Sequence, residues 1–263
     1  LDDTVRRPRY AFFLGRIALR QDDYAAAREL LGAAIDGFRA NGNEARMAEA
    51  LVDLADVYIE QGDYEEADAR LRRAETLWDA QAQPAGLAAV RCRQGLIAYF
   101  EQDLGGAERL CQEGLSFLDQ RNDEIVRSRT LRLLTDIALF RKELERAGVH
   151  LRQADEANRT VGDQTETAAI LFAQAKLDHH LGYHAEALVN ARQSVALYAA
   201  MGDRKAQLVL SHMISRLHQK LGEAEPAQLA AQEALKIATA LGDEAMQRIC
   251  IEQLEITRSM AAA

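Results

Sequence analysis

A period of forty residues runs through the sequence and constrains the fold more than any other feature. The segments LDDT, NGNE, QAQP, RNDE, VGDQ, MGDR and LGDE begin at residues 1, 41, 81, 121, 161, 201 and 241. An alanine recurs at the same step, at Ala27, Ala67, Ala107, Ala147, Ala187 and Ala227. A fixed period of this length indicates repeated supersecondary units that stack on one another.

Residue size is also preserved from one period to the next. We call the residues at one position of the period a column and number it by its place in the first repeat. Column 17 is aliphatic throughout, with Ile17, Val57, Ile97, Ile137, Leu177 and Leu217, whereas column 15 is small, with Gly15, Ala55, Gly95, Thr135, Ala175 and Ser215. Small residues allow two helices to approach to about 8–10 Å. Each repeat is therefore predicted to be a hairpin of two helices.

The turn residues place the ends of these helices. Glycine in column 2 (Gly42, Gly162, Gly202, Gly242) is expected to end a helix, and the polar residues of column 3 (Asn43, Asp123, Asp163, Asp203, Asp243) are expected to cap the next one. The first helix of each repeat, helix A, is predicted in columns 4–20, and the second helix, helix B, is predicted in columns 24–40. We expect one domain over 1–263, with repeats at 4–40, 44–80, 84–120, 124–160, 164–200 and 204–240 and a closing helix at 244–260.

The residues at several positions of the repeat resemble those of a known family. The segment LADVYIEQGDYEEADARLRRA, residues 54–74, resembles the tetratricopeptide consensus at Leu54, Ala55, Tyr58, Gly62, Tyr64, Ala67, Leu71 and Ala74, and residues 14–34 match nearly as well. Repeats three, five and six depart from it at Gln94, Gln174, His184 and Ala224. The resemblance implies an all-α superhelical solenoid of six hairpins plus a C-terminal capping helix. The forty-residue form is similar to arrays in bacterial signal-transduction regulators of the LuxR and maltose-activator types.

In tetratricopeptide proteins, helix A lines a concave groove that holds the partner. Carried over to this sequence, the resemblance implies the groove residues Arg9, Phe12, Arg16, Val52, Asp56, Ile59, Leu96, Tyr99, Arg132, Asp136, Leu139, Phe172, Lys176, His179, His212, Arg216 and Gln219, with Cys92 in the same set. Aromatic residues and arginines are the types that most often anchor interfaces. The alternative is that many of these side chains only pack against the neighbouring repeat.

The charge of the chain bears on the class of partner. The net charge is −9, which opposes direct binding of nucleic acid. Residues 41–80 carry four basic and eleven acidic groups, and residues 121–160 carry nine and seven. This contrast could orient an elongated partner. Alternatively, Glu65, Glu66 and Asp68 only solvate an outer helix.

Cysteine usage and hydropathy indicate where the chain works. Cys92, Cys111 and Cys250 are far apart and form no CxxC pair, which favours reduced thiols in the cytoplasm. No apolar run approaches the roughly 20 residues that span a bilayer, and the first residues do not resemble a secretory signal. We therefore expect a soluble, cytoplasmic protein without membrane partners, and the 27 arginines against five lysines favour a bacterial source. Because the sequence does not begin with Met, we expect it to be an excised domain.

The sequence contains no motif for catalysis or for a cofactor. It has no Gly-Lys dipeptide for a phosphate loop, no GxGxxG and no GxSxG. His179, His180 and His184 are near in sequence, but an expected turn at Gly182 denies them the i, i+4 spacing of a metal-binding helix. We expect no enzyme activity, no cofactor and no metal site.

We consider two functions from different classes as the main hypotheses, and an enzyme as a third. The leading hypothesis is a non-enzymatic scaffold that binds a peptide or protein partner in its groove. The alternative is an effector-sensing domain of a larger bacterial transcriptional regulator, whose ATPase and DNA-binding parts lie outside this chain.

The last helix alternates Ile249, Ile251, Leu254 and Ile256 with Glu252, Gln253 and Glu255, which predicts a partly polar cap and a monomer or weak homo-oligomer.

Overall fold

The structure is a computed structural model that describes residues 3–80, 82–118 and 123–261. These residues form thirteen helices and no strand, which confirms the all-α fold class. The helices A are α1 (Asp3–Arg20), α3 (Glu44–Gln61), α5 (Pro84–Phe100), α7 (Glu124–Phe140), α9 (Gln164–Leu181) and α11 (Arg204–Lys220). The helices B are α2 (Tyr24–Ala40), α4 (Tyr64–Ala80), α6 (Leu104–Phe117), α8 (Leu144–Val161), α10 (His184–Met201) and α12 (Ala224–Leu241), and α13 (Glu244–Ala261) closes the series.

Every helix begins at the residue that the period indicates, or one residue earlier. The one early end is in α6, which stops at Phe117 because Leu118 adopts an extended backbone. The expected turn segments at 1–4, 81–84 and 121–124, the last residues of the third repeat and the end of the alanine tail lie partly outside the described residues. The expectation of a single domain over 1–263 stays a prediction.

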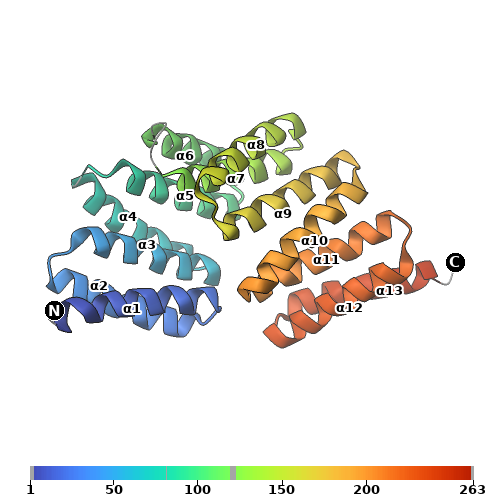
Figure 1. Ribbon diagram of the computed structural model, residues 1–263, viewed down its shortest axis with the longest axis horizontal. Helices are drawn as coiled ribbons and strands as arrows, with labels where there is room; N and C mark the ends of the chain where they lie inside the picture. Colours follow the sequence, from blue (N-terminus) through green and yellow to red (C-terminus); the bar gives the residue numbers. More distant parts are fainter. Residues whose placement is uncertain (1–2, 81, 119–122, 262–263) are drawn as a thin grey trace. The chain divides into compact units, whose positions relative to one another are not determined.

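The chain divides into two compact units, Leu1–Ile137 and Ala138–Ala263. In the first unit, the hairpins α1/α2, α3/α4 and α5/α6 follow one another, and each helix packs beside the next (Figure 1). In the second unit, the hairpins α9/α10 and α11/α12 pack in the same way, and α13 lies against α12 (Figure 1).

The small columns lie where helices A and B approach each other. All six alanines of column 27 are fully buried. In column 15, a Cβ added to Gly15 would lie 2.8 Å from Cγ of Leu31, so this crossing of α1 and α2 has no room for a larger side chain. The repeated small residues therefore mark the places where the two helices of each hairpin pack against each other.

Side-chain caps start most of the helices. Asn43, Asp163, Asp203 and Asp243 accept hydrogen bonds from the backbone N–H three residues later, as expected, and so does Asp123. Asp23, Asp63 and Asp103 cap the helices B of the first three repeats in the same way. The left-handed glycines Gly162, Gly202 and Gly242 end α8, α10 and α12. These caps satisfy backbone groups that the ends of a helix leave unpaired.

We expect Asp243→Ala to lower the free energy of unfolding by about 1 kcal/mol, because the N–H of Met246 loses its acceptor at 2.9 Å. Asp243→Ser should restore most of this loss, since serine also caps helices. Urea denaturation followed by circular dichroism measures both variants. Equal losses for the two substitutions would show that the cap does not stabilise α13.

Candidate functional site

The second unit contains a pocket between two helices A. Its volume is about 260 Å³, and it is lined by Phe172, Lys176, His179 and His180 of α9 and by Val209, His212, Met213, Arg216 and Leu217 of α11. Five of these nine residues are groove residues that the sequence predicts: Phe172, Lys176, His179, His212 and Arg216. The pocket therefore lies on the face of helix A that the resemblance indicates.

The lining of this pocket combines positive charge with apolar surface. The Nζ atom of Lys176 lies 4.9 Å from the ring centroid of Phe172, so its ammonium group packs over an aromatic face. Arg216 is exposed, and no carboxylate is among the lining residues. Such a lining favours a ligand that carries both an anionic group and an apolar group.

Two histidines of the pocket have lowered pKa values. Burial lowers the pKa of His212, and the neighbouring Arg216 lowers it further. Burial also lowers the pKa of His179, together with the charges of His184, Arg216, His180 and Lys220. The Nδ1 atom of His212 is buried and has no hydrogen-bond partner within the described residues.

The turn at Gly182 brings histidines together instead of only separating them. A turn follows α9 at Gly182, as predicted, and Gly182 adopts the left-handed conformation. The chain then folds back, so that the rings of His179 and His184 lie 5.2 Å apart and their Nδ1 atoms 3.4 Å apart. Sequence spacing along one helix could not indicate this contact. Within the described residues, no group of three or more His, Cys, Asp or Glu side chains is placed to hold a metal ion.

The first unit also has a hollow, and its lining includes residues from columns of helix A that line the pocket of the second unit. Its volume is about 360 Å³, and its lining includes Phe12 and Arg16 of α1, Glu49, Val52 and Asp53 of α3, and Arg93 of α5. The guanidinium of Arg16 lies 5.6 Å from the ring centroid of Phe12. Both hollows are therefore lined by columns 9, 12, 13 and 16 of helices A.

Charged side chains in the hollow of the first unit pair with one another. Arg93 donates two hydrogen bonds, of 2.8 and 2.9 Å, to the carboxylate of Asp56. The Nε atom of Arg16 lies 3.4 Å from a carboxylate oxygen of Asp53. Because these charges are already paired, this hollow is a weak electrostatic target for a charged partner.

Burial and the charge of Asp56 raise the pKa of Asp53 from 3.8 to about 6, although Arg16 and Arg93 oppose the shift. A carboxyl group with a raised pKa stabilises the folded chain below pH 3.8, and that contribution is lost as the pH rises through about 6. We expect Asp53→Asn to raise the free energy of unfolding at pH 8 by about 1–2 kcal/mol, and by much less at pH 4.

The fluorescence of Trp78, the single tryptophan, reports on this unit because its side chain lines the same hollow. Urea denaturation of both proteins at pH 4, 6 and 8, followed through this signal, measures the difference. Parallel pH profiles for the two proteins would contradict the account of Asp53.

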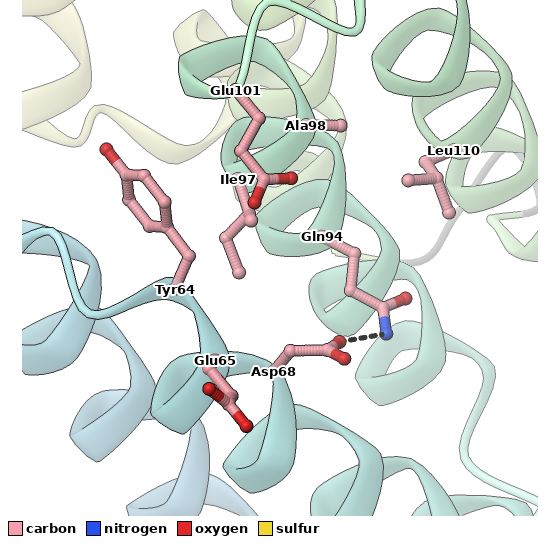
Figure 2. A pocket seen from close by; sticks show the side chains of 8 residues that line it. All are labelled: Tyr64, Glu65, Asp68, Gln94, Ile97, Ala98, Glu101 and Leu110. Carbon is pink, nitrogen blue, oxygen red and sulfur yellow. Dashed lines mark hydrogen bonds between the residues drawn. The ribbon is translucent and has the colours of Figure 1, made fainter.

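A third pocket lies between α4 and α5 and involves none of the predicted groove residues. It has a volume of about 380 Å³ and is lined by Tyr64, Glu65, Asp68, Gln94, Ile97, Ala98, Glu101 and Leu110. Figure 2 shows that Gln94 points toward Asp68, to which its Nε2 donates a hydrogen bond of 3.1 Å. Asp68 also pairs with Arg72, and Glu66 pairs with Arg70. Part of the acidic charge of the second repeat is therefore neutralised within the chain.

The remaining groove residues differ in how accessible they are. Phe12, Val52, Ile59 and Leu139 are buried, as is Cys92, so these side chains belong mainly to the core. Asp56, Leu96, Tyr99, Arg132, Asp136 and Gln219 are half-buried, whereas Arg9 and Arg16 are exposed. Gln219 accepts a hydrogen bond of 3.0 Å from Gln253 of α13. Burial, and next to it Asp136, raises the pKa of Tyr99.

Several residues of the two hollows were absent from the sequence prediction. Among them are Val209 in column 9, Asp53, Arg93 and Met213 in column 13, and His180 in column 20. Columns 9, 13, 16 and 20 follow one another at helical spacing, so they share one face of helix A. Extending column 9 from Arg9 to the later repeats would have found Val209.

Two further observations concern the cysteines and the hydropathy of the helices. Cys92, Cys111 and Cys250 are buried, and each is a free thiol in the described part of the chain. None of the described helices is both long enough and apolar enough to cross a membrane.

Comparison with known proteins identifies the repeats. Residues 9–80 match the model of the tetratricopeptide repeat family. No curated protein sequence matches the chain. The described fold is similar to that of a signal transduction ATPase with numerous domains, with a tetratricopeptide repeat sensor, from Pyrococcus horikoshii (TM-score 0.67, 16% identity). That similarity covers 89% of this chain but 37% of the ATPase, so this chain spans well under half of that protein.

Two other solved structures are similar. One is the APC/C hetero-tetramer Cut9–Hcn1, at TM-score 0.70 and 14% identity, over 95% of this chain and 43% of the matched chain. The other is the Rap conjugation gene regulator of the plasmid pLS20 in complex with the Phr* peptide, at TM-score 0.68 and 18% identity, over 93% and 67%. At these identities the likeness concerns the fold alone. Residues 9–80 of this chain thus match the tetratricopeptide repeat family, and its described helices have the helical-hairpin fold of tetratricopeptide-repeat proteins.

Proposed function

We propose that this chain is a non-enzymatic recognition module that binds a peptide or protein segment on the face formed by its helices A. One observation carries the proposal: each unit has a hollow on that face, and the linings of both hollows include columns 9, 12, 13 and 16 of the repeat. A repeated surface that is hollowed at repeated positions suits an extended partner, which can contact several repeats at once.

The pocket of the second unit supports a finer proposal about the partner. Lys176 and Arg216 bring two positive charges to a pocket without a carboxylate, beside the apolar side chains of Phe172, Val209 and Met213. The segment bound there carries a carboxylate or another anionic group next to an apolar side chain. The net charge of −9 disfavours nucleic acid as the source of that anion.

The similar structures agree with this class of function without identifying the partner. The Rap regulator of pLS20 was solved with a peptide, and Cut9–Hcn1 is a protein complex. We place the present chain in the cytoplasm, as a monomer or weak homo-oligomer, on the basis of its free cysteines and its polar last helix.

Selection from a random peptide library displayed on phage tests the proposal. The wild-type chain should enrich peptides in which Asp or Glu stands beside an aromatic or aliphatic residue. Counter-selection against Lys176→Glu/Arg216→Glu should remove these peptides. A selection that enriches no peptide, or one that enriches the same peptides on both proteins, would contradict it.

A second candidate function is an effector-sensing domain of a larger regulator. The similarity to the ATPase with a tetratricopeptide repeat sensor favours it, because this chain spans only 37% of that protein. Here the pocket would hold a small anionic effector in place of a peptide. The neighbouring reading frame distinguishes the two functions, since a phosphate loop or a helix-turn-helix in the same polypeptide is required by the sensor and not by the scaffold.

A further inference from the structure

The pocket between α4 and α5 lies where the third repeat departs from its neighbours. Column 14 holds a buried aliphatic side chain at Leu54, Leu134 and Ile214. In the third repeat this column holds Gln94, which is half-buried and lines the pocket of about 380 Å³. A polar side chain therefore replaces an apolar one at the wall of a cavity, and the function proposed above does not account for it.

Hydrogen bonds hold Gln94 in place and occupy the nearest arginine. Arg91 donates a hydrogen bond of 2.8 Å to Oε1 of Gln94, and Nε2 of Gln94 donates one of 3.1 Å to Asp68 (Figure 2). Arg91 also donates hydrogen bonds of 2.6 Å to Glu75 and to Glu113. The charge of Arg91 is therefore paired with two carboxylates that lie outside the lining of the pocket.

The lining of this pocket carries negative charge without a compensating cation. Three of its eight residues are acidic, Glu65 and Asp68 of α4 and Glu101 at the end of α5, and none is basic (Figure 2). Asp68 pairs with Arg72, whose side chain is 75% exposed. Glu65 and Glu101 are exposed and form no ion pair within the described residues. The pocket therefore attracts a cation.

The rest of the lining suits a flat cation on an apolar stem. The ring of Tyr64 stacks on the ring of Phe100, with centroids 6.0 Å apart and an angle of 11° between the planes, which holds Tyr64 at the pocket. Ile97 and Ala98 are buried and supply apolar surface. Arginine matches such a lining, because its guanidinium packs on aromatic rings and pairs with carboxylates through parallel hydrogen bonds, while its methylene stem contacts apolar groups.

The size of the pocket and its donor set favour this occupant over a larger ligand or a metal ion. A volume of about 380 Å³ is near the small end of the roughly 300–1,000 Å³ of ligand pockets. Among the residues that the structure describes, no group of three or more His, Cys, Asp or Glu side chains is placed to hold a metal ion. We therefore propose that this pocket binds an arginine side chain of a partner protein. Glu65 and Glu101 pair with the guanidinium, Tyr64 packs against it, and Ile97 contacts the stem.

Short peptides test the proposal directly. The probe is acetyl-Gly-Gly-Arg-Gly-Gly-amide, titrated into the full chain while methyl-resolved NMR spectra are recorded, because a single side chain buries little surface and binds weakly. The methyl signals of Ile97 and Leu110, which line the pocket, should shift along a saturable curve, whereas those of Val189 in the second unit should not shift.

Two matched peptides test the chemistry of the occupant. The same peptide with citrulline, a neutral isostere of arginine, should bind at least about tenfold more weakly, because it lacks the charge. The peptide with lysine should bind at least about threefold more weakly, because an ammonium group cannot form the paired hydrogen bonds of a guanidinium.

Matched variants of the chain test the pocket itself. Glu65→Gln/Glu101→Gln should weaken binding of the arginine peptide at least about fivefold, because both unpaired carboxylates are lost. Gln94→Leu should weaken it at least about threefold, because an apolar side chain then takes the place of the amide. Glu252→Gln/Glu255→Gln, on exposed residues of α13, changes the net charge equally and should alter the affinity less than about twofold. Circular dichroism should show the same helix content in both double variants, since all four side chains are exposed.

The following results would overturn the proposal: no saturable shift of Ile97 and Leu110 with the arginine peptide, equal binding of the citrulline or the lysine peptide, wild-type affinity in either pocket variant, or an equal loss in Glu252→Gln/Glu255→Gln. Methylguanidine carries the same cation without a stem or a peptide backbone and should bind at least about threefold more weakly than the arginine peptide. Equal or tighter binding of methylguanidine would assign the pocket to a small ligand and contradict the assignment to a partner protein. The site is separate from the pocket of the second unit, so none of these results depends on the function proposed for that pocket.

Discussion

Reversing two charges in the pocket of the second unit should weaken peptide binding strongly while leaving the fold intact. In Lys176→Glu/Arg216→Glu, two carboxylates replace the cations that face the pocket, so an anionic segment meets repulsion where it met attraction. We expect the affinity for a peptide enriched on the wild-type chain to fall at least about 30-fold, which corresponds to about 2 kcal/mol. Fluorescence anisotropy at fixed ionic strength measures the change.

The control for this variant changes the net charge equally elsewhere in the same unit. Lys236 on α12 and Arg248 on α13 are exposed and lie outside the pocket. Lys236→Glu/Arg248→Glu should therefore lower the affinity less than about threefold, through the overall field alone. Similar losses in the two double variants would mean that peptide binding follows the net charge and not the pocket.

Enlarging an alanine of column 27 should have the largest effect on stability. Ala187 in α10 is fully buried in the core of the second unit. Leucine at this position would force α9 and α10 apart or push neighbouring side chains out of their rotamers. We expect Ala187→Leu to lower the free energy of unfolding by about 3 kcal/mol, at the upper end of overpacking effects because the contact joins two helices.

Ala185 offers a matched control, because it lies two residues earlier on the same helix and is exposed. Ala185→Leu should change the free energy of unfolding by less than about 0.5 kcal/mol. Urea denaturation followed at the helical circular dichroism band compares the two variants. Equal stability would show that column 27 does not record helix packing.

The period made most of the fold predictable. Ala27 and its five counterparts are fully buried, and Gly15 stands where a Cβ would meet Leu31, so the columns of small residues report real helix crossings. The caps were predictable for a related reason: Asn43 and Asp243 lie immediately before a helix, and their side chains reach the backbone three residues later. Local chemistry and repeated packing gave the same answer at each of these places.

The site was less predictable, because it depends on how side chains of neighbouring repeats meet. The resemblance includes Lys176, His212 and Arg216, which line the pocket of the second unit, and also Phe12 and Ile59, which are buried. The pairing of Arg93 with Asp56 joins residues far apart in sequence, and the contact between His179 and His184 depends on the direction in which the chain leaves Gly182. A single sequence carries no signal for either contact.

The position of a bound peptide tests the central claim most directly. Methyl-resolved NMR spectra can be recorded while a peptide from the display selection is titrated into the labelled chain. The account predicts that the methyl signals of Val209 and Met213, which line the pocket on α11, shift in proportion to occupancy, while those of Val189 on α10 and Leu229 on α12 stay unchanged. Shifts at Val189 and Leu229, with Val209 and Met213 unaffected, would place recognition on the helices B and contradict the account.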